Sequence, residues 1–452
     1  MVKKKTNYVC QNCGATYSKW VGKCENCSEW NTLVEQMPES SEASGKNAVS
    51  RGRFSGKNLE TVSIKDIIPS DESARLSTGF KDFDSVLGGG FLIGSVSLLT
   101  GQPGIGKSTL LMQVCAEISK SAPALYISGE ESAGQIKLRA ERLGASSDNL
   151  HFASSTSGND IAHTIESGQF KFVVVDSIQT LSLAELNSAP GNVSQVTNCG
   201  NLIIRAAKAS GTAVVIVGHV TKDGSLAGPK VLEHLVDVVL NFEGDRYGGF
   251  KTVRAIKNRF GSTTEVAIYE MNRTGLSEVK NPSAALLAER QNTDGSIILA
   301  TLEGTRPILV EIQALATPSS FGYPKRTSSG FDINRLNLLI AVLERRTKLK
   351  LSDKDIFINV VGGLKVQDSA ADLAVCLAIA SAVAKRKLPE DYVVFGEVGL
   401  GGEIRSAFRP DQRISEAKKI GFKHAIAPAT VKDPFVLPVR DLRNTLVKYM
   451  NK

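Results

Sequence analysis

The sequence lacks any apolar run long enough to cross a membrane, and it lacks a secretory signal. Its longest apolar stretch, near residues 373–384, is rich in alanine and too short for a bilayer, so we expect a buried helix there. The first residues include Lys3, Lys4 and Lys5 but no apolar segment follows them. We therefore expect a cytoplasmic protein that has no membrane partner.

The cysteine count and the charge exclude two further classes of protein. Seven cysteines do not form an even disulfide set, so a scaffold held by disulfides is not expected. Acidic residues do not dominate, because the formal net charge is +8, which favours a polyanionic partner without establishing one. The chain has 452 residues, 42% of them hydrophobic and 22% charged, which indicates a globular protein of two to four domains.

The central feature is a glycine-rich segment between an expected strand and an expected helix. Residues 95–99 are expected to form a short, mostly apolar strand, and apolar residues recur at helical spacing between residues 110 and 118. Glycines at such a turn let backbone N–H groups face phosphate oxygens beside the positive end of a helix. Lys107 is placed to reach the β- and γ-phosphates, and Ser108 to offer its hydroxyl to Mg²⁺. The residues expected to hold ATP are Gly101, Gln102, Pro103, Gly104, Ile105, Gly106, Lys107, Ser108 and Thr109.

Three more apolar segments are expected to be strands. They cover residues 124–128, 172–176 and 213–218, and helical stretches alternate with them. This pattern predicts an α/β fold with a parallel sheet that is buried on both faces. Functional residues are then expected at the carboxyl ends of the strands.

Polar residues do follow these expected strand ends. Asp176 ends its strand as a carboxylate that holds the Mg²⁺ shell would. Glu130 is placed to polarise an attacking water, with a helix N-terminal charge beside Glu131 as the alternative. His219 is either a sensor of the γ-phosphate or a plain surface histidine.

An expected hairpin follows, with strands at residues 237–245 and 250–257. It ends in Lys-Asn-Arg-Phe-Gly, and Lys257 and Arg259 lie two positions apart, so they point to the same face of an extended chain. An arginine that reaches a neighbour's nucleotide would tie hydrolysis to oligomer contacts. The alternative is a basic end of a hairpin without such a role.

Two segments near the ligand-facing edge are candidates for DNA contact. Residues 186–195 and 221–230 contain glycine and proline, and the second also contains Lys222. Ordinary connections between elements are the alternative interpretation.

The N-terminus contains two Cys-x-x-Cys pairs with ten residues between them, and the linker expected after them covers residues 38–60. This spacing allows four thiolates to surround Zn²⁺, which would supply most of the folding energy of so small a module. Trp20 and Trp30 flank the second pair, and packing on the metal site is favoured over a surface for a partner. The expected zinc ligands are Cys10, Cys13, Cys24 and Cys27.

The pattern changes after a turn signal at Asn281-Pro282. Strands are expected at residues 296–302, 308–316 and 356–361, with a long helix at 333–346 and another that begins near residue 368. This order is similar to the fold of Lon-type proteases.

The whole chain resembles the bacterial DNA repair proteins of the RadA (Sms) family. The resemblance rests on the phosphate loop, the Gly-Glu-Glu that ends in Glu131, the Lys-Asn-Arg-Phe-Gly pentad and the four cysteines. It implies a zinc finger, a RecA-like ATPase core and a Lon-protease-like α+β domain. The boundaries expected on this basis are 1–37, 38–60 (linker), 61–275, 276–284 (linker) and 285–452.

The resemblance also implies a function. RadA-like proteins are ATP-driven hexameric rings that move on single-stranded DNA, act on branched DNA and have RecA as a partner. The pentad is also similar to the fingers of DnaB-type replicative helicases, which implies that Lys257 and Arg259 act on the neighbour's nucleotide. The implied cofactors are ATP, Mg²⁺ and Zn²⁺, with Asp176 at magnesium and Glu130 as the base.

Lon-type enzymes need a serine at the start of a helix and a lysine on a later helix. The serine position matches Ala370, and the lysine position falls near Asp411. Ser369 is one place away, which turns a helical side chain by about 100°. We therefore expect an inactive protease fold that serves as a scaffold, a hexamerisation platform or a DNA surface.

Three functions remain open at this point. The first is a DNA-dependent ATPase and helicase of recombination. The second is a Lon-like peptidase driven by the ATPase, which would lose activity on Ser369→Ala. The third is a non-enzymatic adaptor that is switched by nucleotide.

Overall fold

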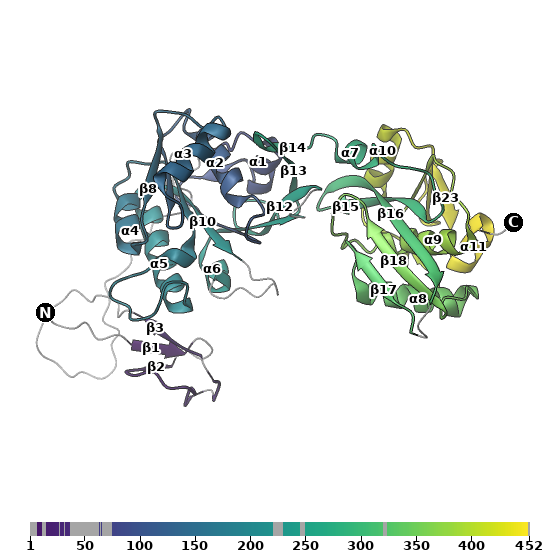
Figure 1. Ribbon diagram of the computed structural model, residues 1–452, viewed down its shortest axis with the longest axis horizontal. Helices are drawn as coiled ribbons and strands as arrows, with labels where there is room; N and C mark the ends of the chain where they lie inside the picture. The colour runs from purple at the N-terminus through teal and green to yellow at the C-terminus, as the bar shows by residue number, and fades with distance from the viewer. Residues whose placement is uncertain are drawn as a thin grey trace, which may run out of the picture. The chain divides into compact units, whose positions relative to one another are not determined.

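A computed structural model describes residues 7–10, 15–26, 28–30, 32–36, 63, 65, 75–219, 229–244, 249–319 and 323–450 (Figure 1). The chain divides into two compact units. One contains Met1–Leu240 and Ile256–Gly261, and the other contains Asn241–Ala255 and Ser262–Lys452. In the described part of the chain, no helix is both long and apolar enough to cross a bilayer.

The N-terminal module is a small antiparallel sheet with the strand order β2-β1-β3. Its core contains Cys10, Cys24 and Leu33, and a partly buried Val21 packs against them. So few apolar groups cannot stabilise a fold alone, which agrees with the expected dependence on metal. Its strands are β1 (Asn7–Cys10), β2 (Thr16–Tyr17) and β3 (Leu33–Gln36).

A nine-stranded sheet follows, with the order β14-β13-β12-β11-β6-β10-β9-β7-β8. The run β6-β10-β9-β7-β8 is parallel, whereas β12-β13 and β13-β14 are antiparallel. The three central strands expected from the sequence are confirmed. The strands are β6 (Val96–Gly101), β7 (Ala124–Ser128), β8 (Leu150–Ser154), β9 (Phe172–Asp176), β10 (Ala213–His219), β11 (Val238–Gly244), β12 (Lys251–Asn258), β13 (Val266–Asn272) and β14 (Gly275–Glu278).

Helices cover the central strands. Alternate residues of the strands, such as Val173 and Val175, join one core with residues of α4 and α5, including Ile161 and Ile203. Helix α2 contacts β7 and β9, and Phe172 of β9 packs on Phe91, with ring centroids 5.1 Å apart. The remaining elements here are β4 (Arg75–Leu76), α1 (Lys81–Leu87), β5 (Phe91–Leu92), α2 (Lys107–Ile118), α3 (Ala133–Arg142), α4 (Gly158–Glu166), η3 (Ile178–Thr180), α5 (Val193–Ser210) and α6 (Pro229–Leu235).

The structure corrects the linker expected over residues 276–284. Residues up to 278 form strand β14, which pairs with β13. The turn signal at Asn281-Pro282 starts a helix instead, α7 (Pro282–Leu287). Asn281 caps it by accepting a hydrogen bond from Ala284 N at 3.1 Å, and proline suits the first helical position.

The C-terminal sheet has the order β17-β18-β16-β15-β19-β22-β23. Helix α9 (Ala371–Ala384) is buried along most of its length, as expected from its apolar sequence, and it packs against β15 and β16. The other elements are β15 (Ser296–Glu303), β16 (Arg306–Pro318), β17 (Arg326–Ser329), α8 (Ile333–Thr347), β18 (Lys354–Val360), β19 (Tyr392–Val394), β20 (Glu397–Val398), β21 (Ile404–Arg405), α10 (Pro410–Ile420), β22 (His424–Pro428), β23 (Val436–Val439) and α11 (Leu442–Met450).

Candidate active site

The glycine-rich loop joins the carboxyl end of β6 to the first turn of α2. Gly104 and Gly106 have φ angles of +76° and +118°, in the left-handed region where a side chain is strained. A Cβ atom on Gly104 would meet nothing within 4 Å, so backbone conformation rather than crowding requires glycine there. Ile105 is buried and anchors the loop. The structure thus has the strand-to-helix turn and the left-handed glycines that the sequence predicts for a phosphate-binding loop.

Lys107 lies inside this loop. Its Nζ atom donates to the carbonyl oxygens of Gly101 at 2.8 Å and Gln102 at 3.0 Å. Burial lowers the pKa of Lys107 to about 8, and the carboxylates of Asp176 and Glu130 partly oppose this shift. Because phosphate oxygens would favour the charged form of the lysine, this ammonium is suited to an anionic ligand.

Asp176 ends β9, where the sequence places it. Its Oδ2 atom accepts a hydrogen bond from the hydroxyl of Tyr126 at 2.5 Å. Burial, with the nearby Asp176 carboxylate, raises the pKa of Tyr126 well above its ordinary value, so the hydroxyl stays a donor. Tyr126 was not identified as a site residue from the sequence. A tyrosine within an otherwise apolar buried strand is the signal that could have found it.

Glu130 lies where the ends of three strands meet. Its Oε1 atom accepts a hydrogen bond from Ser177 Oγ at 2.7 Å and is 3.7 Å from His219 Nε2. Burial lowers the pKa of His219, and the positive charge of Lys107 lowers it further, so the imidazole is neutral near pH 7. The structure therefore gathers Glu130, His219 and Lys107 in one place.

The alternative role of Glu130, as a helix N-terminal charge, is filled by other residues. Ser132 is the N-cap of α3 and shares a capping box with Gln135. Glu131 forms an ion pair with Arg139. Glu130 instead faces Ser177, a polar residue directly after Asp176 that the sequence analysis missed.

The segment 186–195, expected as a candidate DNA-binding loop, is held by hydrogen bonds from the side chain of Gln195 to backbone atoms. Gln195 is buried, accepts a hydrogen bond from Leu183 N at 2.8 Å and donates to Ser188 O at 2.8 Å. A loop fixed in this way is a poor candidate for a grip that adapts to DNA. Residues 221–228 of the second candidate loop lie outside the described residues.

Lys257 and Arg259 contact the C-terminal end of α6 and the two residues that follow it. Arg259 Nη1 donates to Asp237 Oδ1 at 3.2 Å. The Arg259 side chain remains 52% exposed. Lys257 Nζ donates to the carbonyl oxygens of Glu233, His234 and Val236 at 2.8, 3.2 and 2.7 Å.

The two cations lie at the opposite end of β6 from the phosphate loop. Asp237 Oδ2 accepts a hydrogen bond from Val96 N at 3.1 Å, and Val96 is the first residue of β6, whereas the loop follows its last residue. A strand of this length spans about 20 Å. Arg259 is therefore remote from the phosphate loop of its own chain.

Three families and a set of close relatives match the chain. The AAA domain family matches residues 68–225, the rubredoxin metal binding domain family matches 8–35, and the family of the ChlI subunit of Mg-chelatase matches 337–431. The DNA repair protein RadA of Bacillus subtilis is 48% identical over 97% of this chain and 95% of its own. The chain belongs to the RadA family.

Other members of the family give the same result. RadA of Haemophilus influenzae is 47% identical over 98% of each chain, and RadA of Escherichia coli is 47% identical over 94% of this chain and 93% of its own. A crystal structure of the RadB recombinase aligns with a TM-score of 0.37 and 23% identity, covering 45% of this chain and all of that one.

The expected family is confirmed. The expected fold class is confirmed too: an α/β ATPase core, an N-terminal zinc ribbon and a C-terminal Lon-like domain. The match to the AAA domain supports ATP as a ligand.

The described cysteines of the family's zinc ribbon fit zinc. Cys10 and Cys24, one from each Cys-x-x-Cys pair, are buried in the same small core. Tyr17 Oη lies 3.3 Å from Cys24 Sγ, which is the kind of outer contact that orients a thiolate ligand. Cys13 and Cys27 lie outside the described residues.

The resemblance to Lon-type enzymes predicts a serine at position 370 and a lysine near position 411, and this chain has other residues there. Ala370 is buried at the start of α9, and Asp411 is exposed on α10. The Ser369 hydroxyl donates to Glu397 Oε2 at 3.0 Å. Nearby, the buried Arg413 donates to Asp368 Oδ2 at 2.6 Å.

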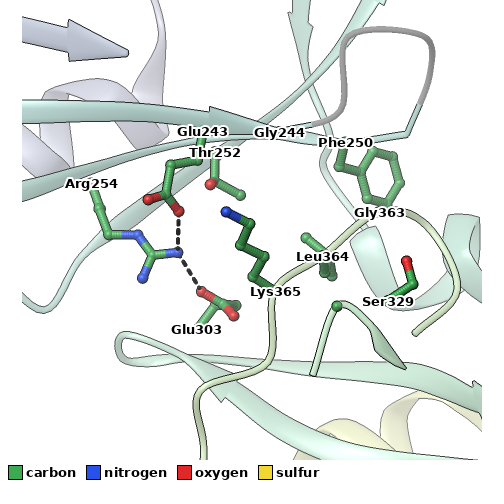
Figure 2. Close-up of a pocket in the computed structure, with 11 residues that line it drawn as sticks. Glu243, Gly244, Phe250, Thr252, Arg254, Glu303, Ser329, Gly363, Leu364 and Lys365 are labelled. Carbon is green, nitrogen blue, oxygen red and sulfur yellow. Dashed lines mark hydrogen bonds and ion pairs between the residues drawn. The ribbon is translucent and has the colours of Figure 1, made fainter. Parts of the chain in front are cut away.

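A cavity of about 210 Å³ lies within the C-terminal unit (Figure 2). Arg254 Nη2 is 3.5 Å from Glu243 Oε2 and 3.3 Å from Glu303 Oε2, and Lys365 extends toward these groups. Burial raises the pKa of Glu303 to about 7, although the charge of Arg254 opposes this. No sequence motif indicated this cluster, because its residues come from separate strands and a loop.

Proposed function

We propose that the chain is a DNA-dependent ATPase and helicase of homologous recombination and repair. It translocates on single-stranded DNA and, with RecA, promotes branch migration of recombination intermediates. The observation that carries this proposal is the grouping of Glu130, Lys107 and Asp176 at one edge of the sheet, with Arg259 at the other. The phosphate loop lies at the carboxyl end of β6 and Arg259 near its amino end, so a complete site would need residues from two subunits.

The described residues suggest how hydrolysis would proceed. Backbone N–H groups of the loop and the Lys107 ammonium bind the phosphates. Ser108 and Asp176 would hold Mg²⁺, which when bound neutralises charge on the phosphate oxygens. Glu130 orients and polarises the attacking water, and Ser177 fixes the Glu130 carboxylate by its 2.7 Å hydrogen bond.

The remote Lys257 and Arg259 support a ring, which we propose to be a hexamer. Arg259 is half exposed and does not reach its own phosphate loop, so a neighbour's nucleotide is the acceptor that suits it. A guanidinium at the γ-phosphate stabilises the negative charge that develops in the transition state. Hydrolysis would then depend on contact between subunits.

The DNA and RecA parts of the proposal rest on sequence and family. A net charge of +8 suits a polyanion, and relatives at 45–48% identity are named DNA repair proteins. Phosphate contacts carry little sequence information, so we expect low base specificity.

Steady-state ATP hydrolysis with and without single-stranded DNA tests this function. We expect DNA to stimulate turnover, and Lys107→Ala to abolish it. Lys120→Ala is the matched control. Lys120 is an exposed lysine just beyond α2, the helix that begins with Lys107, and its side chain contacts only Glu117 in the described part of the chain. If DNA does not change turnover, the motor fails as an explanation and a nucleotide-switched adaptor takes its place.

A further inference from the structure

The two tryptophans of the N-terminal module are exposed. Trp20 and Trp30 retain 55% and 68% of their accessible surface, and they are the only tryptophans in the sequence. The core of the module is built from other residues, so the sequence-based preference for packing on the metal site is wrong. Exposing two large aromatic rings in so small a module is costly in water, which indicates a binding role.

Both rings lie on the same side of the module. A Cβ atom on Gly22 would lie 3.7 Å from Trp20 Cη2 and 3.7 Å from Trp30 Cζ3. The six-membered rings therefore flank one point of the chain. The bridge between Lys23 and Trp30 fixes this arrangement, and Lys23 Nζ lies 5.8 Å from the centre of the Trp30 ring.

The chemistry of this surface suits unpaired bases. Every base has an aromatic face that stacks on tryptophan, whereas the bases of a duplex hide their faces in the helix. Lys19 and Lys23 are exposed nearby and can meet phosphates, but Glu25 and Glu29 are exposed on the same module. These two lysines and two glutamates carry equal and opposite charge, so we assign the preference for unpaired bases to stacking on the tryptophans.

We propose that Trp20 and Trp30 form a stacking platform for unpaired bases of single-stranded DNA. The proposal rests on the proposed function, since it names the residues of the zinc module that would hold the DNA on which the motor acts. Gly22 keeps the space between the rings open, because any side chain there would fill it.

Intrinsic fluorescence tests the platform directly, since all tryptophan emission of the full-length chain comes from these two residues. We expect oligo-dT to quench the emission as it binds. An abasic oligonucleotide of the same length, which has the phosphates without the bases, should leave the emission unchanged. Trp30→Ala should weaken binding to oligo-dT by about tenfold or more, from the loss of one stacked base.

Matched variants separate this effect from damage to the fold. Tyr323→Ala removes an aromatic ring that is 88% exposed in the other unit, and it should leave affinity and quenching unchanged. Trp30→Phe should keep most of the affinity while losing part of the emission. Zinc content and ATP turnover without DNA should be unchanged in the three variants, which shows that the module is intact.

The other outcomes are distinct. If a labelled oligonucleotide binds but does not quench tryptophan emission, the platform is refuted while the motor stands. If Trp30→Ala keeps its affinity for DNA but loses affinity for RecA, the surface is a protein-docking site and our assignment is overturned. If no single-stranded DNA binds at all, the proposed function fails together with the platform.

Discussion

Arg259 and Lys107 serve the same reaction from different subunits if the ring is assembled as we propose. Arg259→Ala should therefore lower ATP turnover by about 10³-fold or more, the value of an arginine that stabilises transferring phosphate. The cost to the fold should be no more than about 1 kcal/mol, because Arg259 is half exposed and makes one ion pair with Asp237 in the described part of the chain. Asp237 retains Lys208 at 3.6 Å and Val96 N at 3.1 Å.

Mixing two inactive variants measures whether the arginine acts between subunits. A Lys107→Ala subunit has lost its nucleotide site but keeps its arginine, and an Arg259→Ala subunit has the reverse defect. In a randomly assembled equimolar ring, about a quarter of the interfaces would pair an intact site with an intact arginine. Turnover in the mixture should therefore rise to as much as about a quarter of the wild-type value.

Controls make the mixing experiment decisive. Mixing wild type with an equal amount of the Lys107→Ala/Arg259→Ala double variant, which offers neither a site nor an arginine, must lower wild-type turnover to about half, which shows that subunits exchange. Arg273→Ala, which removes an exposed arginine from the β13–β14 turn, should retain full turnover. If the mixed variants show no more turnover than either variant alone although subunits exchange, Arg259 does not act on a neighbour and the reasoning is refuted.

Three further perturbations test other groups. The carboxyl of Glu303 keeps its proton up to about pH 7 in the fold and loses it near 4.5 when unfolded, so its contribution favours the fold at low pH and is lost as the pH rises. The free energy of unfolding in urea should fall by about 3 kcal/mol between pH 4.5 and 7 in the wild type because of this group, and Glu303→Gln should not show that fall. The same fall in the variant would contradict the assignment. Tyr126→Phe should weaken Mg²⁺-dependent nucleotide binding several-fold, because Asp176 loses the hydroxyl that orients it; calorimetric titration checks this, and equal affinities would show that the hydrogen bond is dispensable. Ser369→Ala should leave ATP turnover and the absence of peptide hydrolysis unchanged, because the hydroxyl contacts a carboxylate rather than a base of the Lon type; loss of a peptidase activity on this substitution would revive that alternative.

The sequence predicted the parts of the fold that depend on local pattern. Buried parallel strands read as continuous apolar runs, and for this reason β7 and β9 were placed with their observed bounds. The phosphate loop was found because its chemistry requires glycine at fixed spacing. Glu130 and His219 were selected as candidates because parallel strands have their carboxyl ends on one side of the sheet, and the structure places the two side chains 3.7 Å apart.

Other features depend on contacts that no local pattern records. Strand β8 was missed because its sequence, LHFAS, is short and half polar at the edge of the sheet. The segment 186–195 has the composition of a mobile loop, but the buried side chain of Gln195 fixes its backbone by a hydrogen bond to Ser188 O. The tryptophans were expected to pack on the metal site, but the core of the described residues contains neither of them.

The C-terminal unit shows why fold and activity must be argued separately. Its strands and helices match the Lon-like pattern, yet the position that the resemblance predicts for the nucleophile holds Ala370, whose side chain is buried and has no polar atom. The charges around it are used in structure, since Arg335 pairs with Asp372 and Arg413 pairs with Asp368. Removing one partner of a buried ion pair lowers the stability of a protein by several kcal/mol. These groups therefore help to hold α8, α9 and α10 together. With Ala370 at the expected position of the nucleophile and the neighbouring charges paired, we expect this domain to serve as a scaffold rather than as a second catalytic centre.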